Sequence, residues 1–374
     1  MFSSSVPAKH GWNLPTRDVR SAIGFAAGAN YTPYLDAHVY DTTSGSTANF
    51  QPATAHSAGI YGISTRKQGG YISVCTNTDW SIYPFNSSTG FGSRTDYSLS
   101  DARAVRFSPD GTLLAVASTS SVSVYSFSSS GLGSLITTLS TGVSSITDIH
   151  FSYDNRYLGV AGGGGTVLEL FRTGNWSQTP LACPSTPTAA GLDSYNTTWA
   201  DPQENYGWIR LSGVCANGYS YYAYQTQNKV LYGTISGTGL STPSSITFTN
   251  SWYNLAPYGI DFAPEQNFLF VGHSYEDNGK APGPDLRIFA LSNTLPNLVK
   301  EDSVTLGYVG ASNLDGPIPF NIAYMPTQKV LAMGSSDGYG NTRAYWCYSV
   351  SDAGAFTTEL YPTGLRDTRC IDWF

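Results

Sequence analysis

Two stretches of this chain repeat one pattern 44 positions apart, and the repeat constrains the fold more than any other feature. One begins at Ala102 (ARAVRFSPDGTLLAVASTSSVSVYSFSSSG) and the other at Ile146 (ITDIHFSYDNRYLGVAGGGGTVLELFRTG), so that Phe107 and Phe151 are equivalent. Each stretch reads as a strand, a tight turn, an apolar strand, a short break and an alternating strand. The turns SPDG and SYDN contain Asp, Asn and Gly, which tolerate the left-handed backbone of tight turns.

The same order of strands and turns recurs along the chain. Upstream, a copy begins at Gly59 and places Ile63 at the position of Phe107. Three further copies begin downstream, at Tyr206, Tyr258 and Pro319. A unit of ~40 residues plus insertions is typical of a β-propeller, in which each blade is a four-stranded sheet.

The two ends of the chain complement each other. Arg369–Phe374 (RCIDWF) matches the first strand of a unit and stops where the turn should follow. The missing second, third and fourth strands are found near the N-terminus, at SAIGFAAG from Ser21, YLDAHVYDTTSG from Tyr34 and NFQPATAH from Asn49. Pairing the last strand with the first three closes the ring and leaves no exposed edge at the seam. We therefore expect one all-β domain over residues 21–374, a seven-bladed β-propeller closed by its C-terminal strand.

Two short motifs resemble those of a known family. HVYDTTSG resembles the third-strand ending of WD-repeat propellers, and FSPDG resembles their first turn. The Gly-His and Trp-Asp dipeptides of that family are mostly absent. The resemblance extends over roughly Ser21 to Phe374 and implies a divergent WD-repeat-like propeller.

The composition restricts the class of partner. Charged residues make up 12% of the chain, about half the ~25% of ordinary globular domains, and Ser, Thr, Gly and Tyr fill the deficit. The net charge of −7 and the lack of a Lys/Arg cluster argue against nucleic-acid binding. No run approaches a membrane span, and residues 1–20 lack the apolar core of a signal peptide. The five cysteines show no C-x-x-C spacing and are expected to be buried free thiols.

The longest insertions fall in two classes of loop on one face of the predicted ring. These loops join second to third strands, or a fourth strand to the next blade. Because rigid sheets hold such loops in place, we expect a binding face for protein or glycan there. Its candidate residues are Trp199, Trp252, Tyr253, His273, Tyr275, Tyr308 and Tyr339.

Residues 1–20 precede the first predicted strand and form a separate arm. Pro7 and Pro15 favour an extended backbone that costs little entropy to order on binding. Phe2, Trp12 and Leu14 are its apolar groups. We expect the arm to dock on a neighbouring subunit or another assembly component through Trp12, with docking on its own propeller as the alternative.

Catalytic motifs are scarce. The five histidines show no zinc-binding spacing, and there is no G-x-S-x-G elbow or phosphate-binding loop. The sequence therefore predicts no catalytic residue, no metal and no cofactor. One exception stays open, because a propeller can hold a substrate in its central channel as lactonase-like hydrolases do. The innermost strands would line that channel with Arg103, Arg106, His150, Arg210, Asp261, Asn321 and Asp372.

Three classes of function remain. The low charge and the abundance of hydroxyl groups resemble tailed-bacteriophage virion proteins. The first expectation is therefore a non-enzymatic structural or adhesion protein of a virion, in the tail, baseplate or decoration layer. Its partners would be other virion proteins and a host-surface protein or glycan, within a larger assembly. The alternatives are a cytoplasmic interaction scaffold and a lactonase-like propeller hydrolase. Fold alone cannot choose among them.

Overall fold

The computed structural model describes most of the chain, and only strands, turns and loops occur in that part. The described residues are 22–29, 35–41, 47–54, 56, 59–163, 168–182, 208–225, 229–247, 257–273, 286–292, 297–302, 318–326, 328–336, 345–360 and 368–373. Within these ranges there is no helix that could cross a membrane.

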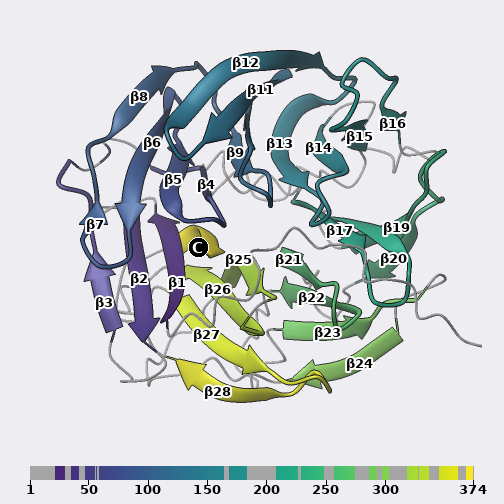
Figure 1. The fold of residues 1–374 in the computed structure, drawn as a ribbon. Coiled ribbons are helices and arrows are strands. Elements are labelled where there is room, and N and C mark those ends of the chain that lie inside the picture. The colour runs from purple at the N-terminus through teal and green to yellow at the C-terminus, as the bar shows by residue number, and fades with distance from the viewer. Residues whose placement is uncertain are drawn as a thin grey trace, which may run out of the picture.

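The described strands form seven antiparallel sheets arranged around an axis (Figure 1). Sheet 1 contains β4 (Gly62–Thr65), β5 (Gly70–Cys75), β6 (Asp79–Asn86), β7 (Gly90–Phe91) and β8 (Thr95–Ser98). Sheet 2 contains β9 (Ala104–Phe107), β10 (Leu113–Ala117), β11 (Ser121–Ser128) and β12 (Gly131–Ser140). Sheet 3 contains β13 (Ser144–Phe151), β14 (Tyr157–Gly163), β15 (Leu168–Arg172) and β16 (Leu181–Ala182).

Four further sheets continue the ring. Sheet 4 contains β17 (Ile209–Val214), β18 (Ser220–Gln225), β19 (Lys229–Ile235) and β20 (Ser244–Thr247). Sheet 5 contains β21 (Pro257–Ala263), β22 (Phe268–His273), β23 (Leu286–Ala290) and β24 (Asn297–Asp302). Sheet 6 contains β25 (Ile318–Met325), β26 (Val330–Ser336), β27 (Tyr345–Val350) and β28 (Phe356–Leu360). Sheet 7 contains β29 (Thr368–Trp373), β1 (Ala22–Ala29), β2 (Leu35–Asp41) and β3 (Thr47–Phe50).

The turns after the innermost strands of sheets 2 and 3 have the expected chemistry. Gly111 and Asn155 both have positive φ, 66° and 59°, and this is the conformation that the turns SPDG and SYDN were expected to need. The equivalence of Ile63 with Phe107 is wrong by two positions. The N–H of the residue after Thr65 bonds back to the carbonyl of Tyr71, just as the N–H after Phe107 bonds to Leu113. Thr65 therefore occupies the position of Phe107.

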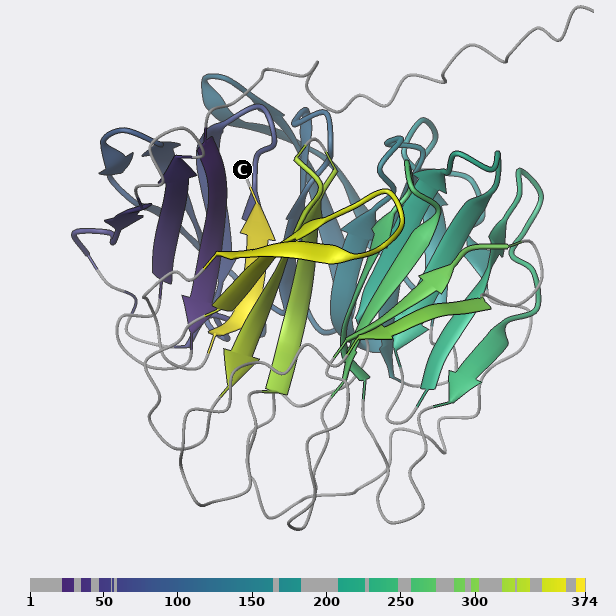
Figure 2. The same ribbon diagram turned by 90° about the horizontal axis from the view of Figure 1, so that it is seen from below.

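The C-terminal strand pairs with the N-terminal part of the chain. β29 runs antiparallel to β1, with Asp372 opposite Ala26 and Cys370 opposite Gly28. Only glycine fits at position 28, because a Cβ there would lie 2.5 Å from the Cys370 sulfur and 2.6 Å from a methyl carbon of Ile60. Seen from the side, β29 rises toward the edge of the ring at which the chain ends (Figure 2).

The hydrophobic core lies between neighbouring sheets. Leu114, Val116 and Phe107 of sheet 2 pack in one cluster with Trp80 and Ile82 of sheet 1. Equivalent clusters join sheets 2 and 3, 3 and 4, 4 and 5, 5 and 6, and 7 and 1. Because apolar side chains fill these junctions, the polar side chains of the innermost strands are left to face the axis.

Four of the five cysteines lie in the described part of the chain. Cys75, Cys215, Cys347 and Cys370 are buried and free, as the sequence predicts. Burial raises the pKa of Cys215 to about 12, so this thiol stays protonated and unreactive at neutral pH.

Candidate active site

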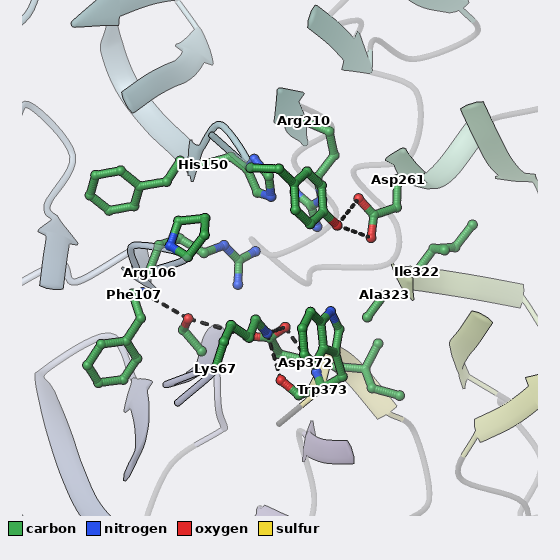
Figure 3. Close-up of a pocket in the computed structure, with 15 residues that line it drawn as sticks. Lys67, Arg106, Phe107, His150, Arg210, Asp261, Ile322, Ala323, Asp372 and Trp373 are labelled. Carbon is green, nitrogen blue, oxygen red and sulfur yellow. Dashed lines mark hydrogen bonds and ion pairs between the residues drawn. The ribbon is translucent and has the colours of Figure 1, made fainter. Parts of the chain in front are cut away.

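A pocket opens at the carboxyl ends of the innermost strands (Figure 3). Its empty volume is about 570 Å³, open solvent at the mouth included. The turns after β4, β9 and β13 supply Lys67, Pro109 and Tyr153. Each of the seven innermost strands supplies one residue at the same level. We call these the ring residues: Ser64, Arg106, His150, Arg210, Asp261, Ala323 and Asp372.

Four ring residues tie neighbouring sheets together. An innermost strand is a sheet edge with unpaired N–H groups, and an acceptor side chain on the adjacent sheet can satisfy one of them. The bonds run from Phe107 N–H to Ser64 Oγ (2.9 Å), Leu211 N–H to His150 Nδ1 (3.3 Å), Tyr324 N–H to Asp261 Oδ2 (2.7 Å) and Thr65 N–H to Asp372 Oδ2 (2.8 Å). These bonds fix the orientation of the side chains that face the pocket.

The Asp148 carboxylate forms ion pairs with both arginines among the ring residues, Arg106 and Arg210. It lies on β13, two residues before His150, and is buried. Its Oδ1 lies 3.3 Å from Arg106 Nη2, and its Oδ2 lies 2.8 Å from Arg210 Nη1. Burial alone would lower the pKa of Arg106, but Asp148 and Asp372 raise it, and the net shift is upward. The Arg106 guanidinium is therefore charged, and the ion pairs with Asp148 hold both guanidinium groups in fixed positions.

Lys67 is the third basic side chain of the pocket, after Arg106 and Arg210. Its Nζ donates hydrogen bonds to the Asp372 carboxylate and to the carbonyl of Trp373 (2.6 Å), and it lies 4.2 Å from the centre of the Trp373 ring. Burial lowers the pKa of Lys67, while the Asp372 carboxylate opposes this effect. Lys67 thus links sheet 1 to the C-terminal strand β29 and also lines the pocket.

Asp261 is a buried carboxylate with three hydrogen-bond donors. The backbone N–H groups of Phe262 and Tyr324 donate to Oδ1 (2.8 Å) and Oδ2 (2.7 Å). The Tyr153 hydroxyl lies 3.3 Å from Oδ1 and 3.5 Å from Oδ2. Burial raises the pKa of Asp261 to about 6, although Arg210 and the backbone donors oppose the shift. The carboxylate is therefore ionised at neutral pH and is a stronger base than an exposed one.

His150 is neutral in the folded protein. Burial lowers its pKa well below the ordinary value, and the nearby cations Arg210, Arg106 and Lys67 lower it further. Because Nδ1 accepts the N–H of Leu211, the proton of the neutral ring is assigned to Nε2. His150 can therefore donate a hydrogen bond through Nε2, but it cannot act as the base.

The pocket thus combines one carboxylate base with several donors. Figure 3 shows the Arg106 guanidinium pointing into the space between the Asp261 side and the Lys67–Asp372 side. Among the described residues, no group of three or more His, Cys, Asp or Glu side chains could hold a metal ion. A base beside hydrogen-bond donors suits the addition of water to a carbonyl compound.

Five of the seven residues expected to line the channel do line the pocket, and these are Arg106, His150, Arg210, Asp261 and Asp372. Arg103 does not. It precedes β9, its side chain is 30% exposed, and it lies 3.9 Å from Asp101. The side chain of Asn321, expected from sheet 6, lies outside the described part of the structure, and on the same strand Ala323 lines the pocket.

Sequence reasoning missed Lys67 and Tyr153. Both lie in turns that were read only as connections, RKQG after β4 and SYDN after β13. Their signal is positional, since a turn that follows an innermost strand lies at the same level as the carboxyl end of that strand. Asp148 was missed as well, although it lies two residues before His150 and so shares its face of the strand.

The predicted binding face lies almost wholly outside the described residues. This applies to Trp199, Trp252, Tyr253, Tyr275, Tyr308 and Tyr339, and to Phe2, Trp12 and Leu14 of the arm. His273 ends β22, where its backbone pairs with Pro257 at the start of β21. The pocket residue Asp261 lies toward the other end of β21, so His273 and the pocket belong to opposite ends of this strand pair.

Comparisons with known proteins identify the fold. The family model described as WD domain, G-beta repeat matches residues 97–126, and no curated protein matches the sequence. The periplasmic gluconolactonase of Pseudomonas aeruginosa is 16% identical with a TM-score of 0.64, over 94% of this chain and 99% of that one. A candidate 6-phosphogluconolactonase of Bacteroides uniformis is 14% identical with a TM-score of 0.63, over 95% and 100%. The Swd1 β-propeller domain of Myceliophteria thermophila is 11% identical with a TM-score of 0.54, over 85% and 90%.

These findings confirm an all-β propeller and correct the expected function. The resemblance to bacteriophage virion proteins finds no support. The expectation of a non-enzymatic virion protein is wrong, because the structural neighbours described as lactonases agree better with the alternative of a lactonase-like hydrolase. Composition misled that expectation, since a surface poor in charge is compatible with many functions. The chain is a β-propeller that resembles, and diverges from, the WD-repeat propellers.

Proposed function

We propose that this chain is a hydrolase that opens a lactone, a cyclic ester, in the pocket formed by the ring residues. The observation that carries the proposal is the pairing of a buried carboxylate base, Asp261, with fixed donors on Arg106 and His150 in one pocket. Perturbed acids that line a concave site are typical of catalytic centres. The gluconolactonase and 6-phosphogluconolactonase neighbours support the same reaction class.

In the proposed reaction, Asp261 acts as the general base. Its carboxylate takes a proton from a water molecule as the water oxygen bonds to the carbonyl carbon of the lactone. The carbonyl oxygen becomes an oxyanion, which the Arg106 guanidinium and the His150 Nε2–H stabilise. The bond from the carbonyl carbon to the ring oxygen then breaks. The ring oxygen takes the proton back from Asp261, so that one lactone and one water give one hydroxy acid.

The charge balance of the pocket suits this reaction. Three basic side chains, Lys67, Arg106 and Arg210, line the pocket, and the Asp261 carboxylate is ionised at neutral pH because its pKa is raised only to about 6. Asp148 and Asp372 are engaged in ion pairs with these basic side chains, and this leaves Asp261 as the carboxylate bound mainly by neutral donors. A carboxylate held by neutral donors keeps more of its basicity than one in an ion pair.

The test is the hydrolysis of δ-gluconolactone, followed by the base consumed at constant pH and corrected for the spontaneous rate. We expect turnover by the wild-type protein and a loss of at least about 100-fold in Asp261→Asn, the size expected for a general base. The matched control is Glu169→Gln. Glu169 is also a buried carboxylate that accepts a backbone N–H, from Gly142, but it does not line the pocket, and this variant should keep the wild-type rate. Wild-type turnover that survives Asp261→Asn would reject the proposed base.

A further inference from the structure

Tyr153 of sheet 3 forms a hydrogen bond with a residue of sheet 5, although sheet 4 comes between these two sheets in chain order. It lies in the turn between β13 and β14 of sheet 3, yet its hydroxyl bonds to Asp261 on β21 of sheet 5. The two residues are 108 positions apart. Sheet 4 contributes Arg210 to the same pocket, where Figure 3 shows Arg210 and Asp261.

The tyrosine hydroxyl differs from the other two donors to Asp261. The N–H groups of Phe262 and Tyr324 belong to strands, and they hold the two oxygens at 2.8 and 2.7 Å. The hydroxyl of Tyr153 lies between the oxygens at longer distances of 3.3 and 3.5 Å. It is the side-chain donor among the three, and a side chain can be changed without altering the backbone.

The Tyr153 hydroxyl is the donor in its hydrogen bond with the Asp261 carboxylate. Burial and the Asp261 carboxylate raise the pKa of Tyr153 well above its ordinary value, so the phenol keeps its proton over the whole working range of pH. A neutral O–H that donates to a carboxylate favours the ionised form of that carboxylate and lowers its pKa. The Tyr153 hydroxyl therefore acts against the burial that raises the pKa of Asp261.

Other charged groups also face Asp261 and form the background to this effect. Arg210 on β17 favours its ionised form. Asp372 on β29 and Glu265, which follows β21, disfavour it. Lys67 also interacts with Asp261. A change at Tyr153 leaves all of these groups in place, so the contribution of the hydroxyl can be measured separately.

We infer that Tyr153 is a positioning residue for Asp261: from sheet 3 it reaches across the pocket and holds the carboxylate of sheet 5 ionised and oriented for proton transfer. The catalytic part of this inference rests on the proposed function. The effect of Tyr153 on the protonation of Asp261 does not rest on the proposed function, because it is the same whether or not a lactone is the substrate.

The test measures the pKa of Asp261 directly, by ¹³C NMR of its side-chain carboxyl carbon, in the wild type and in Tyr153→Phe. We expect the pKa to rise by about one unit when the hydroxyl is removed. In the proposed reaction, the acid limb of the kcat/KM profile should move to higher pH by the same amount, with KM little changed. Tyr153→Leu also lacks the hydroxyl and is the second variant if Tyr153→Phe does not fold.

The matched control is Tyr224→Phe. Tyr224 is a buried tyrosine of sheet 4 whose hydroxyl donates to the carbonyl of Gly162, outside the pocket. This variant should leave the pKa of Asp261 unchanged. An unchanged or lowered pKa in Tyr153→Phe, or an equal rise in Tyr224→Phe, overturns the inference. A rise confined to Tyr153→Phe supports it even if the wild-type protein hydrolyses no lactone, and that second result would reject the proposed function alone.

Discussion

Asp372 Oδ2 accepts a hydrogen bond of 2.8 Å from the backbone N–H of Thr65, a residue 307 positions earlier in the chain. The neighbouring Lys67 donates to the same carboxylate and to the carbonyl of Trp373. The C-terminal strand is therefore joined to sheet 1 by charge-assisted bonds, in addition to its strand pairing with β1. The ring seam and the pocket share these residues, so the stability of the seam and the shape of the site are linked.

The Lys67–Asp372 pair should behave as a coupled unit in stability measurements. Asp372→Ala leaves the ammonium group of Lys67, which is 13% exposed, without its carboxylate. We expect this variant to lower the free energy of unfolding by about 3 kcal/mol. The double variant Asp372→Ala with Lys67→Met should recover part of that loss, because no unpaired charge remains. Urea denaturation of the wild type, the two single variants Asp372→Ala and Lys67→Met, and the double variant measures the coupling, and strictly additive losses would show that the pair is not coupled.

His150 should make the fold sensitive to acid. Its pKa is lowered in the folded state, so the stability that comes from keeping it neutral is present above the unfolded pKa of about 6.5 and is lost as the pH falls below it. His150→Asn keeps an acceptor for the N–H of Leu211 but cannot become charged. We expect its free energy of unfolding to change less than that of the wild type between pH 7 and pH 5.

His150→Ala is the comparison for that experiment. It removes the acceptor as well as the charge, and it should cost about 1 kcal/mol at pH 7, where His150→Asn should cost little. A wild-type protein whose stability falls no faster than that of His150→Asn on acidification would mean that this histidine is not buried neutral.

Asp261 should have the opposite effect on stability. Its folded pKa is raised to about 6, so its contribution to stability is fully present below the unfolded pKa of 3.8 and is lost as the pH rises through the folded value. Relative to Asp261→Asn, the wild type should lose about 2 kcal/mol of unfolding free energy between pH 4 and pH 8. Thermal unfolding of both proteins over this range measures the difference, and a constant difference would contradict a raised pKa.

Much of the fold follows from local sequence patterns. The repeats around Phe107 and Phe151 contain the turn residues Gly111 and Asn155, whose positive φ is a local property that sequence reveals. The two-position error at Ile63 has a physical cause. The turn of sheet 1 begins at Arg66, and its sequence RKQG lacks the Asp or Asn that marks the other turns, so its exact position had no local signal.

The site was predictable in part. His150, Arg210, Asp261 and Asp372 were expected at the channel because residues on the innermost strands of a ring converge on its axis, whatever their sequence separation. Their chemistry was not predictable, because the raised pKa of Asp261 depends on burial and on donors from other sheets. The Tyr153 contact was also out of reach, since it joins a turn of sheet 3 to a strand of sheet 5 and no sequence pattern encodes that distance.

The pH dependence of kcat/KM for δ-gluconolactone tests the central claim most directly. If Asp261 is the base, kcat/KM should rise tenfold per pH unit below about 6, the pKa of Asp261, and level off above it. Asp261→Asn should lower this activity at least about 100-fold while the protein stays folded. No turnover above the spontaneous rate at any pH, or a profile that Asp261→Asn leaves unchanged, would contradict the account.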